Sequence, residues 1–251
     1  MRNIKLTLEY DGSRYDGWVK SDKGIGKKGG SICDRISEVL KEMEGTDVEL
    51  IPAIRTESGV HAMKQVACFK SNSGKSPLEI KQYLNRYLPR DIAVLSADYA
   101  EERFHPAFNA KGFVFEYHLT VGEVPSVFER KYNHYCFKKL DIEAMKRAAA
   151  LLKGKHDFKA FSDNPRMKKS TIRDISDITI YDAGNEVSVT MEADDFWPNM
   201  ARIIVALLVS IGHHENEPEI INRIFESGDR SLNPEAIEPK GLFLSDVIYE
   251  K

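Results

Sequence analysis

Residues 54–69 read IRTESGVHAMKQVACF, a polar loop between two apolar runs, and this stretch determines how the neighbouring strands connect. The first run, Val48–Ile54, predicts a strand, and Gln65–Lys70 predicts the next one. Between them the chain places a cation, a carboxylate and an imidazole from Arg55 to His61. Loops held by a rigid sheet are frequent sites of chemistry, so this loop is a candidate for function, with an ordinary solvated turn as the alternative.

Two helices and two further strands are expected around this loop in residues 1–105. Alternating apolar residues predict a strand over residues 4–10, Ser31 can cap a helix, and Ser76-Pro77 begins a second helix. Residues 92–99 complete the set as a strand. The order β-α-β-β-α-β is that of the ferredoxin-like arrangement, in which two helices cover one face of an antiparallel sheet.

The second half of the chain repeats this order approximately, without visible sequence identity to the first. We expect strands at residues 113–121, 175–181, 187–191 and 242–249, and helices that begin at Asp141, Pro198 and Glu219. The sequence therefore predicts an α+β fold of two ferredoxin-like halves, residues 1–105 and 106–251. Their antiparallel sheets are expected to join edge to edge around a central cleft.

The composition is that of a globular protein, with 251 residues of which 42% are hydrophobic and 30% charged. The longest apolar stretch, residues 203–211, is far shorter than the roughly 20 residues that span a bilayer, so no membrane span is expected. The N-terminus passes directly into a strand pattern without an apolar leader, which predicts a cytoplasmic protein. The three cysteines are widely spaced and fit neither a disulfide framework nor a zinc motif.

Positive charge is concentrated in two segments, although the net charge of the chain is −3. Residues 153–173 carry seven cations against two acids, and residues 20–28 carry four lysines against one aspartate. Each cluster alone is most simply a solvated surface loop. Two such loops in one chain favour a polyanionic partner.

Two other kinds of site fit the candidate loop poorly. Ser58 lacks the G-x-S-x-G turn of a nucleophilic serine, because Thr56 stands where the first glycine is required. His61 has no second histidine or carboxylate at metal-ligand spacing, and His213-His214 are adjacent residues that point in different directions. The sequence predicts neither a serine hydrolase nor a metal site.

Six segments of the chain resemble the tRNA pseudouridine synthase A family in their order and approximate spacing. They are EYDGSRYDGW, RTESGVHAMKQV, RFHPAFNAKGFVFEYHL, GKHDFKAF, NMARIIVALLVSIG and PKGLFLSDVIYEK. The most specific is the loop, which in that family reads R-T-D-x-G-V-H-A. The resemblance covers nearly the whole chain and implies isomerisation of uridine to pseudouridine in tRNA, without a metal or organic cofactor, by an enzyme that is usually a homodimer.

The resemblance also implies a single catalytic carboxylate, acting either as a nucleophile on the sugar or base, or as the base of a glycal route. Matching the loop residue by residue places this carboxylate at Glu57, and matching the later helix places a partner arginine at Arg202. An arginine can hold a desolvated carboxylate ionised through a bidentate, charge-assisted pair. We therefore expect Glu57 and Arg202 to form an ion pair across the cleft.

Further residues are expected to bind the RNA. His61 is expected to orient the loop, Phe115 to stack on the flipped uracil, and the lysines to contact phosphates. Arg14 is either a contact to the nucleotide backbone or an exposed turn residue. The full set of predicted substrate-binding residues is Arg55, Thr56, His61, Phe115, Arg14, Lys168, Lys169 and Arg173.

The chain departs from the family pattern at four positions. Glu57 stands for the family's aspartate, Phe115 stands for a tyrosine with Tyr117 as the nearest phenol, and Val19 and Cys33 stand for glutamines. Two hypotheses follow. The chain is either a working synthase that accommodates the longer acid, or a catalytically silent relative that binds or remodels structured RNA. The basic loops fit both, and the retained arginines favour the first.

Overall fold

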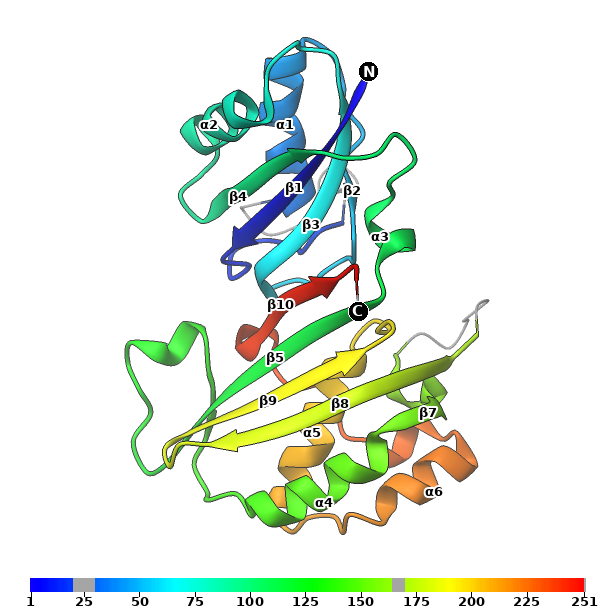
Figure 1. Ribbon diagram of the computed structural model, residues 1–251. Helices are drawn as coiled ribbons and strands as arrows, with labels where there is room; N and C mark the ends of the chain where they lie inside the picture. The colour runs from blue at the N-terminus through cyan, green and yellow to red at the C-terminus, as the bar shows by residue number, and fades with distance from the viewer. Residues whose placement is uncertain (20–29, 164–169, 251) are drawn as a thin grey trace. The chain divides into compact units, whose positions relative to one another are not determined.

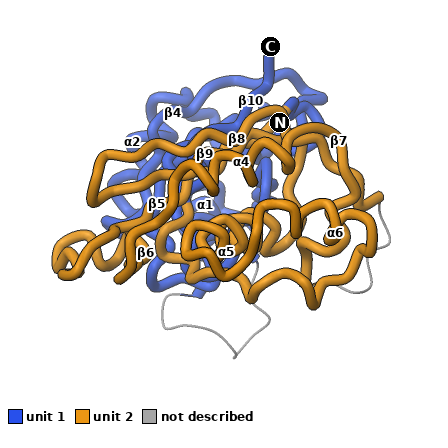
Figure 2. Tube along the Cα trace, turned by 90° about the horizontal axis from the view of Figure 1, so that it is seen from below, with its two compact units in different colours: residues 1–111, 243–251 blue, residues 112–242 orange. Residues whose placement is uncertain are grey.

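The computed structural model describes residues 1–19, 30–163 and 170–250 (Figure 1). The chain divides into two compact units, unit 1 with Met1–Lys111 and Phe243–Lys251, and unit 2 with Gly112–Leu242 (Figure 2). Each unit combines a mostly antiparallel sheet with helices, which confirms the α+β class. The junction of the two sheets and the cleft stay predictions.

Unit 1 is built on a sheet in which β1 (Arg2–Tyr10) lies between β4 (Ile92–Tyr99) and β3 (His61–Ser71), antiparallel to both. The other edge of β3 is shared by two short partners. The strand β2 (Ile51–Pro52) pairs antiparallel with residues 67–68 of β3, and β10 (Leu242–Ile248) pairs parallel with residues 61–62. The sheet of a β-α-β-β-α-β unit is thus present.

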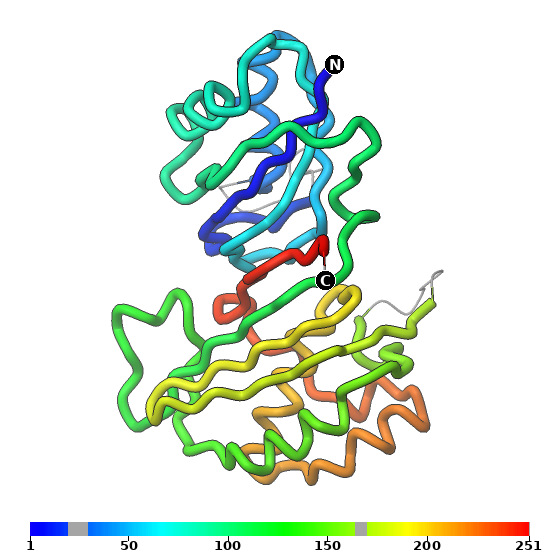
Figure 3. The backbone as a smooth tube through the Cα atoms, viewed as in Figure 1, coloured from blue at the N-terminus to red at the C-terminus, as the bar shows by residue number. Residues whose placement is uncertain are grey.

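The C-terminal strand explains why the units differ from the predicted halves. The sequence predicts a boundary at residues 105/106 and gives the last strand to the second half. In the structure the chain returns to unit 1, where Phe243 is in register with His61 on β3 (Figure 3). The backbone N–H of Lys111 also donates to the carbonyl of Ile248 at 2.6 Å. These contacts place residues up to 111 in unit 1 as well.

Two helices lie on one face of the unit 1 sheet, as the sequence predicts (Figure 1). The helix α1 (Ile32–Glu44) begins at its cap Ser31, whose hydroxyl accepts from the backbone of Asp34 at 3.0 Å. The helix α2 (Pro77–Tyr87) begins with a complete capping box between Ser76 and Glu79. A short helix, α3 (Pro106–Asn109), was not predicted.

The strands around the candidate loop have different bounds from the predicted ones. The first is shorter than the expected 48–54 and covers only Ile51–Pro52. Beyond it, the N–H of Ala53 still donates to the carbonyl of Val66 on β3 at 2.7 Å, whereas the carbonyl of Thr56 accepts from the N–H of Trp18. The second begins at His61 rather than Gln65. His61 is therefore the first residue of a buried strand and not part of a solvated loop.

The strands of unit 2 are β5 (Gly112–Val121), β6 (His134–Cys136), β7 (Gly154–Asp157), β8 (Ile172–Asp182) and β9 (Glu186–Ala193). Four of them form an antiparallel sheet with the order β5-β9-β8-β7. The short strand β6 pairs parallel with β5. The predicted hairpin is β8 with β9, whereas β6 and β7 are too short to show an alternating pattern.

The helices of unit 2 are α4 (Ile142–Leu152), α5 (Met200–Gly212) and α6 (Ile220–Ser227). Only two residues of α5 are not buried, and Arg202 is one of them. The helix begins at Met200, two residues after the predicted Pro198, because Asn199 caps it with a left-handed φ of 64°. Within the described part of the chain, no helix is long and apolar enough to span a membrane.

Candidate functional site

The candidate loop, residues 53–60, rests on a buried polar floor in unit 1. The hydroxyl of Tyr10, the last residue of β1, lies 2.8 Å from Oγ1 of Thr56. The amide Nε2 of Gln65 donates to the Tyr10 hydroxyl at 3.3 Å and to the carbonyl of Ile54 at 2.8 Å. Burial raises the pKa of Tyr10 to about 12, so its hydroxyl stays a neutral hydrogen-bonding group at physiological pH.

A second segment, the turn 11–18 with the sequence DGSRYDGW, packs directly against this loop. The N–H of Trp18 donates to the carbonyl of Thr56 at 3.0 Å, and the N–H of Gly59 donates to the carbonyl of Tyr15 at 3.3 Å. Two glycines permit this approach. A Cβ on Gly12 would lie 1.9 Å from the carbonyl oxygen of Val60, and a Cβ on Gly17 would lie 2.3 Å from that of Thr56. The two sequence motifs therefore form one rigid structure.

Glu57 occupies the first position of a tight turn in the loop. The N–H of Val60 donates to the Glu57 carbonyl at 3.1 Å, and Gly59 at the third position has a φ of 82°. This is the geometry of a type II turn, which requires a positive φ at that position and hence favours glycine. The hydroxyl of Ser58 donates to the carbonyl of Tyr15 at 3.2 Å. The Glu57 side chain is half-buried beside this fixed backbone.

His61 follows the loop as a buried anchor. Its ring is 1% exposed and stacks on Phe243 with ring centroids 4.6 Å apart. The N–H of Gly12 donates to Nδ1 at 3.1 Å, and Oδ1 of Asp11 lies 3.2 Å from the same nitrogen. A single ring nitrogen cannot accept from Gly12 and donate to Asp11 at once, so the tautomer decides which contact forms. In either state His61 ties the start of β3 to the turn 11–18.

The two predicted arginines of this region have different surroundings. Arg14 is 60% exposed and pairs with Asp91, with 2.5 Å between Nε and Oδ2, while its guanidinium also donates to the Tyr15 hydroxyl at 3.1 Å. These bonds raise the pKa of the Arg14 guanidinium. Arg55 is exposed at the edge of the loop.

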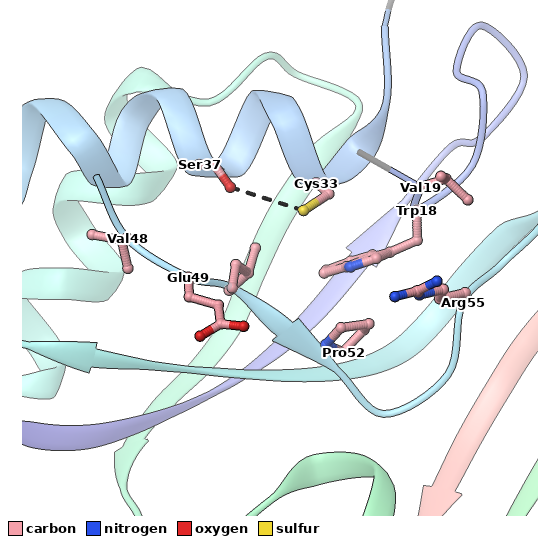
Figure 4. A pocket seen from close by; sticks show the side chains of 9 residues that line it. Trp18, Val19, Cys33, Ser37, Val48, Glu49, Pro52 and Arg55 are labelled. Atoms are coloured by element: carbon pink, nitrogen blue, oxygen red, sulfur yellow. Dashed lines mark hydrogen bonds between the residues drawn. The ribbon is translucent and has the colours of Figure 1, made fainter. Parts of the chain in front are cut away.

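A pocket of about 420 Å³ opens beside Arg55 (Figure 4). Its walls come from the turn 11–18, the start of α1, residues 48–52 and the candidate loop. Two of the positions that depart from the family pattern, Val19 and Cys33, contribute to its lining. No local sequence pattern predicts this pocket, because its walls come from four separate segments.

In unit 2, Arg202 is held at the first turn of α5. Its Nε donates to the carbonyl of Ile237 at 2.6 Å, and its Nη1 donates to Oδ1 of Asn199 at 3.0 Å. These bonds fix the direction of the guanidinium, which agrees with the expectation that a half-buried arginine on an apolar helix needs polar contacts.

Asn199 links Arg202 to an ion pair between Asp163 and Arg230 that was not predicted from the sequence. Its Nδ2 donates to Oδ2 of Asp163 at 2.7 Å, and the other carboxylate oxygen accepts from Nε of Arg230 at 2.9 Å. We call Arg202, Asn199, Asp163 and Arg230 the arginine network. The partners are separated by up to 67 residues in the sequence, so no local motif indicates them.

The two candidate aromatic residues of β5 differ in how they are held. Phe115 is 5% exposed and its ring meets that of Phe196 edge to face at 5.0 Å. Tyr117 is fully buried, and its hydroxyl donates to the carbonyl of Glu238 at 2.7 Å. Burial raises the pKa of Tyr117. The phenol of Tyr117 is thus engaged within unit 2, and Phe115 remains the candidate for stacking on a base.

Arg173 lies on β8 with its guanidinium largely enclosed. It pairs with Asp195 at 3.2 Å, donates to the carbonyls of Ser170 and Ile172, and lies over the ring of Trp197 at 4.5 Å. These contacts give Arg173 a structural role in unit 2. Lys168 and Lys169 lie outside the described residues.

The predicted pair of Glu57 and Arg202 would join a residue of unit 1 to a residue of unit 2, and it stays a prediction. In the part of the chain that the structure describes, no group of three or more His, Cys, Asp or Glu side chains could hold a metal ion.

Comparisons with known proteins give one consistent result. A family model described as tRNA pseudouridine synthase matches residues 148–250. A tRNA pseudouridine synthase A 2 of Clostridium perfringens is 39% identical over 249 residues, which covers 99% of this chain and 100% of the relative. With the same coverage, a tRNA pseudouridine synthase A 2 of Bacillus cereus is 36% identical and a tRNA pseudouridine synthase A of a Bacillus species is 39% identical.

Proposed function

The chain belongs to the tRNA pseudouridine synthase A family, and on that premise we propose that it isomerises uridine to pseudouridine in tRNA with Glu57 as the reacting carboxylate. Membership rests on similarity over the full length of its relatives and makes the chain an isomerase of the pseudouridine synthase class.

The reaction sets clear demands on the site. The bond between N1 of uracil and C1′ of the ribose breaks, the base turns, a bond between C5 and C1′ forms, and the hydrogen of C5 is replaced while N1 gains a proton. No oxidant or reductant is needed. A carboxylate can attack C1′ or the base, or it can remove a proton from the sugar. Each route requires a carboxylate held in a defined position while water is limited.

The placement of Glu57 is the observation that carries the proposal. The carboxylate extends from a type II turn, and the backbone on both sides of it is bonded to the turn 11–18 through Thr56 and Gly59. The Tyr10 hydroxyl fixes the Thr56 side chain from below. A site built on such a supported loop keeps its geometry when a substrate binds.

Arg202 is the proposed partner of this carboxylate. Its Nε and Nη1 are directed by Ile237 and Asn199, so the guanidinium is oriented before any substrate arrives. A preoriented arginine forms a charge-assisted pair at a lower entropic cost than a mobile one.

Recognition of the RNA is proposed to follow the residues predicted from the sequence. Lys168, Lys169 and Arg14 would contact phosphates, which sets affinity and its salt dependence. The target base would leave its stack to reach Glu57, with Phe115 facing the flipped uracil. We further propose that the protein is a cytoplasmic homodimer, on the ground of its family. Analytical ultracentrifugation of the purified protein tests the oligomeric state.

Carbodiimide mapping of pseudouridine in an unmodified tRNA transcript tests the proposed function. The wild-type protein is expected to convert at least one uridine, Glu57→Ala to convert none while still binding tRNA, and the exposed control Glu42→Ala to match the wild type. Binding without conversion by the wild type would instead support a silent RNA-binding relative, which the longer acid at position 57 favours. Absence of binding at low salt would reject RNA as the substrate.

A further inference from the structure

We propose that the pocket beside Arg55 binds the nucleobase adjacent to the target uridine, so that the enzyme reads one flanking nucleotide of its RNA (Figure 4). This inference rests on the proposed function and adds a second base-binding position to it. We call the cavity the flanking-base pocket. Its main lining residues are Trp18, Cys33, Ser37, Glu49, Pro52 and Arg55.

The chemistry of the lining suits a planar heteroaromatic ring. Val19 and Pro52 supply accessible apolar surface, Arg55 supplies a cationic donor with a planar face, and Glu49 supplies a carboxylate acceptor. Nucleobases carry donors and acceptors around an apolar ring, and proteins that read single-stranded RNA hold unstacked bases between aromatic or arginine planes. The volume of about 420 Å³ lies within the range of small-ligand sites.

The position of the pocket ties it to the reacting carboxylate. Arg55 precedes Glu57 by two residues, and two residues of chain span at most about 7 Å. The N–H of Trp18 also donates to the carbonyl of Thr56, the residue between them, at 3.0 Å. The wall of the flanking-base pocket and the candidate loop therefore form one rigid part of unit 1. A strand whose uridine meets Glu57 brings a neighbouring base to this wall.

The accessible side chains of the pocket wall can contact an RNA strand. The exposed guanidinium of Arg55 can pair with the RNA backbone or stack on the base. Enzymes that flip a base commonly set their sequence context through contacts to the flanking nucleotides.

The experiment compares tRNA transcripts in which the nucleotide 5′ or 3′ of the mapped target carries no base. The wild-type KM is expected to rise by roughly 5- to 150-fold for one of the two abasic transcripts, as loss of one stacked base predicts, with kcat changing less. Ser37→Phe fills the pocket from α1 and is expected to raise the KM for intact tRNA by a similar factor. In Ser37→Phe the abasic substitution should have no further effect. Glu42→Phe, an aromatic on the exposed side of the same helix, is the matched control.

Alkylation of Cys33, mapped by peptide mass, gives a readout that does not depend on activity or on a folded Ser37→Phe. Intact tRNA should slow alkylation of Cys33, and the sensitive abasic transcript should not. Unchanged wild-type KM values for both abasic transcripts, or equal protection by all transcripts, would overturn the flanking-base pocket while pseudouridine formation persists. A wild-type protein that forms no pseudouridine would instead remove the proposed function on which the inference rests.

Discussion

The Tyr10 hydroxyl and the Thr56 side chain lie 2.8 Å apart in a fully buried contact that joins the end of β1 to the residue before Glu57. Gln65 completes the contact by donating to the same phenol at 3.3 Å. The sequence separation of Tyr10 and Thr56 is 46 residues, yet each lies inside one of the segments that resemble the family. This bond shows that the turn 11–18 and the candidate loop are held by the same buried hydrogen bonds.

Tyr10→Phe is expected to lower the free energy of unfolding by about 1–3 kcal/mol at pH 8, because Thr56 and Gln65 lose a buried partner. The difference should shrink above pH 10. Burial raises the folded-state pKa of Tyr10 to about 12, so the stability from its neutral form is fully present below the unfolded value of 10.0 and is lost as pH rises toward 12. Urea unfolding of both proteins from pH 8 to pH 11 measures this.

By pH 11 the wild-type protein should therefore have lost roughly 1.4 kcal/mol more of its free energy of unfolding than Tyr10→Phe, because pH 11 lies about one unit above the unfolded pKa. Tyr117 and Tyr249 also have raised pKa values, but they titrate in both proteins and cancel in the comparison. If the difference in the free energy of unfolding between the two proteins stays constant with pH, Tyr10 ionises as freely in the folded state as in the unfolded chain.

Gly17→Ala is expected to disrupt the contact between the turn 11–18 and the candidate loop. The new Cβ would lie 2.3 Å from the carbonyl oxygen of Thr56, at a residue whose φ is 82°. Strain and overpacking together should cost about 2–5 kcal/mol of stability. A shift of the loop by about 1 Å would lower kcat by about a hundredfold. Thermal unfolding and the tRNA assay measure the two effects.

Gly45→Ala separates the two causes. Gly45 has a similar φ of 74°, but no atom lies within 4 Å of its added Cβ. Gly45→Ala should lose only the stability that backbone strain costs, about 1–2 kcal/mol, and should keep full activity. Equal losses of activity in both variants would mean that close packing at Gly17 does not position Glu57.

The sequence predicts the regular elements well where their signals are local. The cap at Ser31, the helix start at Ser76-Pro77 and the alternation of β1 depend on a few neighbouring residues, and the structure has them where expected. Bounds near Pro52 and His61 were wrong because they depend on pairing with other strands. Ile51 and Pro52 pair with residues 67–68, and His61 pairs with Phe243, which is distant in the sequence.

The candidate site could be predicted only in part for the same reason. A family motif identifies Glu57, Arg55 and His61, since they are close together in one loop. The arginine network and the flanking-base pocket are assembled from segments that no local pattern connects. Both depend on which side chains come into contact after folding, and the periodicity of the sequence does not predict those contacts.

Asn199→Gly tests whether the arginine network positions Arg202. Glycine tolerates the φ of 64° at this helix cap, so the backbone can keep its conformation while both hydrogen bonds of the side-chain amide are lost. Loss of one charge-assisted hydrogen bond is worth about 1.5–3 kcal/mol, which converts to roughly a 10- to 150-fold lower kcat if the guanidinium is displaced. Single-turnover rates and melting temperatures should show slower chemistry with a similar fold stability.

A conservative change on the same network provides the control. Asp163→Asn keeps an acceptor for Asn199 and removes the charge that pairs with Arg230. Because Asp163 is substantially exposed, this variant should lose less than about 1 kcal/mol of stability and little activity. If Asn199→Gly retained the wild-type kcat, the position of Arg202 would not depend on Asn199.

Glu57→Asp is expected to increase the rate of pseudouridine formation, by up to about a hundredfold. The shorter side chain keeps the carboxylate and withdraws it by about one methylene, to the reach that the family's aspartate has. The type II turn at Ser58-Gly59 and the bonds of Thr56 involve backbone and neighbouring side chains, so the substitution leaves the loop unchanged.

Glu57→Gln, which retains the length but cannot act as a carboxylate, should be inactive. Single-turnover conversion of a tRNA transcript, with Glu42→Asp as the control, distinguishes reach from charge. A slower Glu57→Asp enzyme would mean that the loop and Arg202 have adjusted to the longer acid, because only a site fitted to glutamate loses rate when the carboxylate is withdrawn.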